Sequence, residues 1–155
     1  MKSVWFYNYP VGAIGIAEED GALSHVFLTK DKFFEDFEVI KTPLIEKASV
    51  QLTEYFNGKR SKFDVPLSLH GTAFQIKVWK ALQTIPAGIT RSYQDIAIHV
   101  GSPKACRAVG MANKRNPLLI IVPCHRVIGK DNTLTGFAGG LAVKKYLLEL
   151  EKCYV

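Results

Sequence analysis

The first seventy residues begin with three short runs in which apolar residues alternate with polar ones or follow one another. The runs cover residues 2–9, 12–18 and 22–29, and short turn sequences separate them. Period-two alternation places one face of each run in a core, and Asp20-Gly21 is a favoured sequence for a tight hairpin turn. The pattern predicts an antiparallel meander of three strands.

A helix is predicted to follow the meander. Thr42 provides an N-cap and Pro43 suits the first turn, while Gly58 marks the C-terminal end. Apolar residues between them recur at helical spacing, which gives the helix one buried side. The acidic segment 31–38 is compatible with a second, short helix. Nothing in residues 1–70 looks catalytic, so this half of the chain is expected to support the other.

From Thr72 onward the apolar positions recur mainly at helical spacing. Thr72 caps a helix with an apolar stripe, which Pro86 interrupts. Ser92 and Asp95 have the spacing of a capping box and open a second helix over residues 93–100.

A Gly-Ser-Pro turn at residues 101–103 leads into a third helix, Lys104–Lys114, with Ser102 as its expected cap. Helix, short turn and helix form the helix-turn-helix arrangement. The third helix combines small residues with Lys104 and Arg107, which suits a close approach to phosphates. The same small residues also suit tight packing against another helix, and the helix alone leaves both interpretations open.

The run Leu118–Val122 lies between two prolines and is predicted to be a short buried strand. Cys124 follows at the end of this rigid segment, with His125 beside it. A thiol has a reference pKa of about 8.5, so Cys124 needs a base or a cation such as His125 or Arg126 to ionise at neutral pH. A cysteine after an apolar strand is more often a core residue than a catalytic one. The Cys-His pair alone does not distinguish these two roles for Cys124.

The chain ends in a predicted helix, Leu141–Lys152. Its inner side is expected to carry Leu141, Tyr146, Leu147 and Leu150. Glu151, near the end of this helix, is able to orient a histidine and so complete a chain of nucleophile, base and orienting group.

Composition predicts a protein of the reducing cytoplasm with no membrane partner. The chain has 155 residues, of which 48% are hydrophobic and 22% charged, as in ordinary soluble proteins. No apolar segment approaches the roughly 20 residues that span a bilayer, and the N-terminus lacks the features of a signal peptide. Three cysteines cannot form an even disulfide framework.

The net charge of +6 is unevenly distributed. Residues 1–70 carry 8 Lys and Arg against 10 Asp and Glu, whereas residues 71–155 carry 12 against 4. The basic surplus lies in the half that holds Cys124. Together with the helix-turn-helix, it favours nucleic acid as a partner over a merely solvated basic face.

Several motifs together resemble those of the methylated-DNA–protein-cysteine methyltransferases, which repair guanine alkylated on its 6-oxygen. Pro123-Cys124-His125-Arg126-Val127 matches the family's active-site signature. Further matches at the family's spacing are Ser92-Tyr93-Gln94, Lys104-Ala-Cys-Arg107-Ala-Val-Gly110, Asn116-Pro117, Gly139-Gly140-Leu-Ala-Val-Lys144 and Leu147-Leu148-x-x-Glu151. The resemblance is strong from about residue 72 onward, and before that it rests on length and a strand-then-helix plan.

The resemblance implies an α+β fold of two domains. Residues 1–70 would form a supporting domain that is ribonuclease-H-like, an antiparallel sheet with helices. Residues 71–155 would form a mostly helical, winged-helix-like domain that binds DNA through the helix-turn-helix. The implied reaction transfers the alkyl group of 6-O-methylguanine, and less efficiently of 4-O-methylthymine, irreversibly to Cys124. The base would be flipped from double-stranded DNA through the minor groove, and each molecule would react once.

The family's catalytic roles map onto this sequence by position. Cys124 would accept the alkyl group, His125 would take the thiol proton through a water molecule, and Glu151 would fix the tautomer of His125. Arg107 would enter the base stack in place of the guanine, and Tyr93 would push on its phosphate and contact the ring.

The remaining implied roles concern binding and support. Guanine would be held by the main chain of Cys124 and Val127 through its amino group and by the Ala138 amide through its 6-oxygen, with Phe137 and Gly139 in the same loop. Further implied DNA contacts are Lys104, Ala105 and Cys106, and Asn116 and Arg126 would support the site. The implied protein is a monomer with no cofactor.

Two features depart from some relatives. No cysteine precedes Cys106, so a four-ligand zinc site of the kind some relatives carry in the N-terminal domain is not expected. Phe137 stands where some relatives have tyrosine, which leaves the range of alkyl groups open.

Three other classes of protein account for fewer of these features. A catalytically silent relative that flags alkylated DNA would lack the cysteine. A cysteine hydrolase with a Cys-His-Glu triad would turn over repeatedly and would leave the helix-turn-helix unexplained. A transcription regulator would explain the helices but not the nucleophile, and it would form dimers on paired half-sites.

Overall fold

The computed structural model describes residues 1–29, 36–129 and 140–154. It contains two compact units, Met1–Leu69 with Pro117–Ile121, and His70–Asn116 with Val122–Val155. These units differ in one segment from the expected division after residue 70, because Pro117–Ile121 groups with the N-terminal unit. Within the described residues, no helix is long and apolar enough to cross a membrane.

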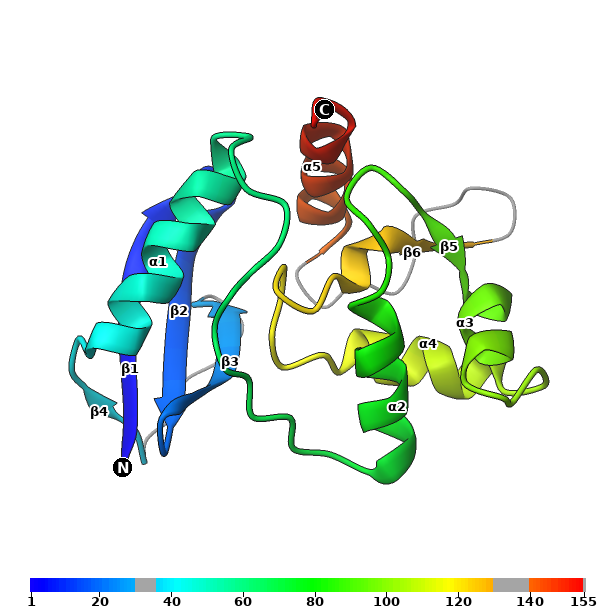
Figure 1. The fold of residues 1–155 in the computed structure, drawn as a ribbon, viewed down its shortest axis with the longest axis horizontal. Coiled ribbons are helices and arrows are strands. Elements are labelled where there is room, and N and C mark those ends of the chain that lie inside the picture. The colour runs from blue at the N-terminus through cyan, green and yellow to red at the C-terminus, as the bar shows by residue number, and fades with distance from the viewer. Residues whose placement is uncertain (30–35, 130–139, 155) are drawn as a thin grey trace. The chain divides into compact units, whose positions relative to one another are not determined.

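The N-terminal unit is built on the predicted meander. Its antiparallel strands are β1 (Lys2–Tyr9), β2 (Gly12–Glu19) and β3 (Ala22–Leu28). A two-residue strand, β4 (Glu38–Val39), pairs in parallel with β1, so the sheet order is β3-β2-β1-β4 (Figure 1). Asp20 and Gly21 both have positive φ, 53° and 86°, as a tight hairpin turn matched to the sheet twist requires.

The helix α1 (Pro43–Phe56) covers this sheet and has the bounds that its caps predict (Figure 1). The Thr42 side chain accepts a hydrogen bond from the Ile45 amide at 3.2 Å. The short helix considered for residues 31–38 falls partly on residues 30–35, which lie outside the described residues. Where the description resumes, Glu38 and Val39 are extended.

The C-terminal unit is mainly helical. Its elements are α2 (Ala73–Leu82), β5 (Arg91–Ser92), α3 (Tyr93–His99), α4 (Cys106–Lys114), the 3-10 helix η1 (Cys124–Arg126), β6 (Val127–Ile128) and α5 (Leu141–Lys152). The predicted capping boxes of Thr72 and Ser92 are both present. Trp79 is a core residue of α2, as its apolar stripe predicts, and its Nε1 donates to Ala112 O of α4 at 2.9 Å.

The second helix of the helix-turn-helix begins later than predicted. It starts at Cys106 rather than Lys104, and no side chain caps it. The Ser102 carbonyl accepts from the Ala105 amide at 2.9 Å, so residues 102–105 form a turn before the helix begins. Gln94 of α3 stabilises this turn, because its Nε2 donates to Pro103 O at 2.8 Å.

The predicted strand Leu118–Val122 is wrong, although its burial is correct. Only Leu118 makes an isolated bridge, to Val26, and Ile120 has a positive φ of 71°. The Ile121 amide bonds to Leu119 O at 2.8 Å, which closes a three-residue turn. An apolar run is buried in either conformation, and its periodicity cannot distinguish a strand from a folded turn.

The helix α5 has the predicted bounds, but of the residues expected on its inner side only Leu147 is fully buried. Its buried residues are Lys144, Leu147 and Glu151. Leu141 and Tyr146, which were expected on the inner side, are 53% and 39% exposed. Two charged side chains therefore lie inside the protein on one face of α5.

Candidate active site

Three consecutive residues of the predicted signature lie buried on η1. Cys124 and His125 are fully buried and Arg126 is 5% exposed. Pro123, with φ −80° and ψ 66°, forms an inverse γ-turn in which the Cys124 amide bonds to Val122 O at 2.8 Å. The chain therefore turns tightly at Cys124 instead of ending a strand there.

Glu151 of α5 joins His125 and Arg126 in one buried network. Its Oε2 lies 2.5 Å from His125 Nε2. Arg126 donates to both carboxylate oxygens, from Nε at 2.8 Å and from Nη2 at 3.0 Å. Arg126 Nη1 also donates to Ile85 O at 2.6 Å. The predicted contact between Glu151 and a histidine is thus present, and Arg126 has the partners that the sequence did not reveal.

This network determines the protonation state of His125. Burial by itself would raise the pKa of Glu151, but its bonds to His125 and Arg126 outweigh burial and hold that pKa far below its usual range. An ionised carboxylate only accepts hydrogen bonds, so Nε2 of His125 must carry the proton. Burial also lowers the pKa of His125, which keeps the ring neutral. Nδ1 of His125 then presents a lone pair, and it has no protein partner among the described residues.

Cys124 is a thiol at neutral pH in the resting protein. Burial raises its pKa to about 11, while a hydrogen bond from Asn116 and the charge of Lys144 act in the opposite direction. The site therefore holds a poor nucleophile beside a neutral base with an available lone pair. Such a pair can form a thiolate when the proton moves to the imidazole.

Two asparagines near the end of α4 hold the backbone around the cysteine. Asn116 Nδ2 donates to Val122 O at 2.7 Å, which agrees with its expected supporting role. Asn113 Nδ2 donates to Cys124 O at 3.2 Å. Both amides are buried, so these bonds are shielded from competing water.

Sequence reasoning missed Asn113 and Lys144. Lys144 is fully buried, and its Nζ donates to Val127 O at 2.6 Å. Burial lowers the pKa of Lys144 to about 8, against an opposing effect from Cys124. Lys144 lies three residues before Leu147 and seven residues before Glu151, which places all three on one face of a helix. This spacing was the available signal that Lys144 is buried. Asn113 gave no signal, because only the fold brings it to Cys124.

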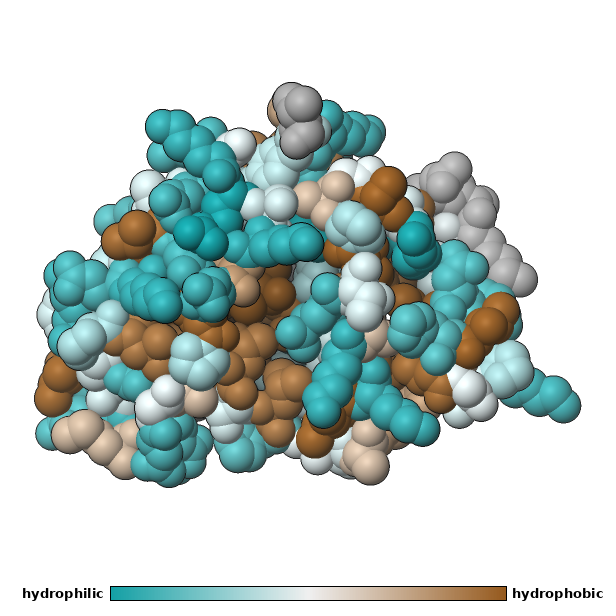
Figure 2. Space-filling model, viewed as in Figure 1, coloured by the Kyte–Doolittle hydropathy of each residue, from teal (hydrophilic) through white to brown (hydrophobic). Residues whose placement is uncertain are grey.

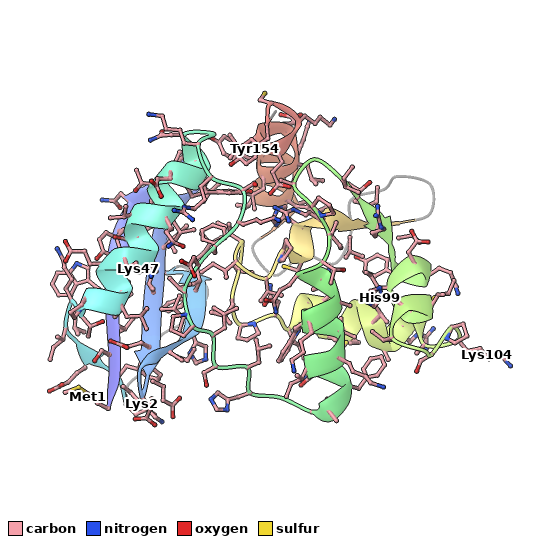
Figure 3. All side chains as sticks on the ribbon, viewed as in Figure 1. Met1, Lys2, Lys47, His99, Lys104 and Tyr154 are labelled. Carbon is pink, nitrogen blue, oxygen red and sulfur yellow. The ribbon has the colours of Figure 1, made fainter. Side chains whose placement is uncertain are left out.

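The residues expected to contact DNA lie on α3, on α4 and in the turn that precedes α4. Lys104 and Arg107 are exposed, whereas Tyr93, Ala105 and Cys106 are partly buried. Figure 3 shows Lys104 extending away from both helices, and Figure 2 shows hydrophilic side chains projecting at that edge. The parallel pair of β5 and β6 places Ser92 opposite Ile128, so the start of α3 is tied to the segment that follows Cys124.

Three further site residues were expected in the loop before α5. Phe137, Ala138 and Gly139 are outside the described residues. Across residues 1–29, 36–129 and 140–154 there is no group of three or more His, Cys, Asp and Glu arranged to hold a metal ion.

Two family models cover most of the chain. The model described as 6-O-methylguanine DNA methyltransferase, DNA binding domain, matches residues 73–153. The model described as 6-O-methylguanine DNA methyltransferase, ribonuclease-like domain, matches residues 4–69. Together they match both halves of the α+β arrangement.

Individual proteins agree with these matches. The constitutive methylated-DNA–protein-cysteine methyltransferase of Bacillus subtilis is 51% identical over 150 residues, which cover 92% of this chain and 91% of that protein. The Mycobacterium tuberculosis protein of the same name is 48% identical over 146 residues, 92% of this chain and 88% of that protein. The crystal structure of Mycobacterium tuberculosis OGT in complex with DNA superposes with a TM-score of 0.91 at 45% identity, covering 97% of this chain and 92% of that one.

Proposed function

Because this chain belongs to the methylated-DNA–protein-cysteine methyltransferase family, we propose that Cys124 is the cysteine that receives the alkyl group. The protein functions in DNA repair by direct alkyl transfer from 6-O-methylguanine to a cysteine of its own chain. DNA is its partner. The observation that carries the assignment to Cys124 is the buried network of His125, Glu151 and Arg126 that begins at the adjacent residue.

The first chemical step is removal of the thiol proton. His125 is held neutral with its proton on Nε2, so Nδ1 takes the Cys124 proton through a bridging water molecule. Glu151 stays ionised and stabilises the imidazolium that forms, as the carboxylate does in other nucleophile–histidine–acid arrangements. Lys144 and Asn116 favour the thiolate, since both lower the pKa of Cys124.

The second step is displacement at the methyl carbon. The thiolate sulfur bonds to the methyl group while the bond from that carbon to the 6-oxygen breaks, and its electron pair remains on the guanine. The Tyr93 hydroxyl and the Ala138 amide are the groups we expect to stabilise the negative charge that develops there. The product is a thioether, which no group among the described residues of the site is equipped to cleave, so we expect one molecule to repair one base.

Access to the methyl group requires the nucleotide to leave the base stack. We assign Arg107 to the space that the extruded guanine vacates and Tyr93 to its phosphate, with Lys104, Ala105 and Cys106 against the backbone of the minor groove. Extrusion costs a few kcal/mol, which is smallest for a poorly paired damaged base. The protein acts as a monomer with little sequence preference.

Intact mass spectrometry tests this assignment. The protein is mixed with duplex DNA that contains a single 6-O-methylguanine, beside a Cys124→Ala control. We expect the wild type alone to gain a methyl group, with a yield that saturates at one per protein molecule. Transfer that persists in Cys124→Ala would disprove the assignment to Cys124. Binding without any mass gain would indicate a silent reader of damage, and repeated turnover would indicate a hydrolase.

A further inference from the structure

The two ends of the Asn113 side chain have different surroundings. This side chain lies on α4, fully buried. Its Nδ2 donates to Cys124 O at 3.2 Å. Its Oδ1 is buried as well, but it has no hydrogen-bond partner among the described residues. Buried polar atoms without a partner are rare in folded proteins and often mark functional positions.

A 180° rotation of the Asn113 side-chain amide would not remove the unpaired acceptor. Cys124 O is an acceptor, so the amide must present its nitrogen to that carbonyl and its oxygen to the other side. A buried acceptor without a donor destabilises the fold. Since none of the described residues supplies that donor, a ligand or a solvent molecule can supply it.

Two main-chain carbonyls beside the cysteine already accept hydrogen bonds. Cys124 O accepts from the Val127 amide within η1 as well as from Asn113 Nδ2, which uses both of its lone pairs. Val127 O accepts from Lys144 Nζ at 2.6 Å. These are the two carbonyls expected to bind the guanine amino group. Asn113 Oδ1 is an unpaired acceptor on the side chain whose Nδ2 already donates to one of these carbonyls.

The chemistry of the damaged base selects the donor. Methylation of the 6-oxygen removes the proton from N1, so the ring nitrogens N1, N3 and N7 only accept hydrogen bonds. The 2-amino group is the remaining N–H donor of 6-O-methylguanine. 4-O-Methylthymine has no N–H donor on its ring.

We propose that Asn113 Oδ1 accepts a hydrogen bond from the 2-amino group of the extruded 6-O-methylguanine, which makes Asn113 a specificity-determining residue. The inference rests on the proposed function, because it requires the flipped base to lie beside Cys124. One amide then performs two tasks, since Nδ2 orients the backbone of the alkyl acceptor while Oδ1 selects guanine over bases that lack the amino group.

A substrate that lacks only the amino group gives the direct test. Single-turnover transfer rates are measured for the wild type with duplexes that contain 6-O-methylguanine or 6-O-methylhypoxanthine, at saturating DNA. The same pair of substrates is given to Asn113→Leu, which is close in size, and to Asn57→Leu, a matched control at an exposed asparagine of the other unit. We expect the wild type and the control to favour 6-O-methylguanine by about tenfold, the factor that one net hydrogen bond supplies.

For Asn113→Leu the expected result is loss of this preference. Its rate on 6-O-methylguanine should fall to about the rate on 6-O-methylhypoxanthine. A wild type that methylates itself equally fast from both substrates would overturn the inference while leaving the proposed function intact. Equal losses on both substrates in Asn113→Leu would also overturn it, because they would indicate that Asn113 only positions Cys124. No transfer from either substrate to the wild type would overturn the proposed function itself.

The wild-type comparison keeps the test decisive if Asn113→Leu fails to fold. In that case Asn113→Ala replaces it, with circular dichroism to verify folding. A preference retained in Asn113→Ala would contradict the role of Oδ1.

Discussion

Glu151 Oε2 lies 2.5 Å from His125 Nε2, and both side chains are fully buried. The same carboxylate accepts two hydrogen bonds from Arg126. This arrangement ties α5 to η1 and leaves Nδ1 of His125 as the end of the imidazole that can accept a proton.

Replacement of Glu151 by glutamine should slow alkyl transfer by about 100-fold, the lower range for general base catalysis. The amide can donate a hydrogen to Nε2, and His125 would then protonate on the wrong nitrogen. The single-turnover rate with DNA that contains 6-O-methylguanine measures this. Glu149→Gln is the matched control, because Glu149 is exposed on the same helix. A variant as fast as Glu149→Gln would show that the tautomer of His125 does not limit the reaction.

Stability should depend on pH through His125. Burial lowers its pKa in the folded state, so the unfolded state binds more protons below about pH 6.5, the usual pKa of histidine. The free energy of unfolding should therefore fall as the pH drops through that value, with a limiting slope of about 1.4 kcal/mol per pH unit. Denaturant unfolding of wild type, His125→Gln and His99→Gln tests this. The slope should shrink in His125→Gln and persist in the exposed His99→Gln.

Removal of the buried ammonium group should reduce the reactivity of Cys124. The charge of Lys144 lowers the thiol pKa, so Lys144→Met should raise that pKa and lower the thiolate fraction by about tenfold for each unit. The rate of alkyl transfer near neutral pH should fall accordingly. Lys145→Met, at the exposed neighbouring position, should keep the wild-type rate. Equal rates in the two variants would exclude an electrostatic role for Lys144.

Lys104 should contribute to DNA affinity without sequence preference. It is exposed at the turn that enters α4 and extends away from the helices (Figure 3). Lys104→Ala should weaken binding to all duplexes alike and reduce the slope of log affinity against log salt by about one phosphate contact. Fluorescence anisotropy over a salt series measures both effects. Lys47→Ala, on α1 of the other unit, is the control and should leave the slope unchanged. Equal slopes in the two variants would show that Lys104 does not contact DNA phosphates.

The sequence by itself determined the elements whose cause is local. The turn at Asp20-Gly21 and the caps Thr42, Thr72 and Ser92 were all correctly predicted, because each depends on residues within a few positions. The signature around Cys124 led to the hypothesis that this residue is the nucleophile, and its motif indicated the family, which the comparisons confirm.

Only the tertiary structure decided the rest of the site. The run Leu118–Val122 looked like a strand because burial and strand pairing favour the same apolar residues, and a chain that folds back at Ile120 has the same composition. Lys144 and Asn113 reach the backbone around Cys124 from helices that lie 20 and 11 residues away in the chain. A hydrogen bond acts over about 3 Å of space, and no periodicity in the sequence records which distant side chains come that close.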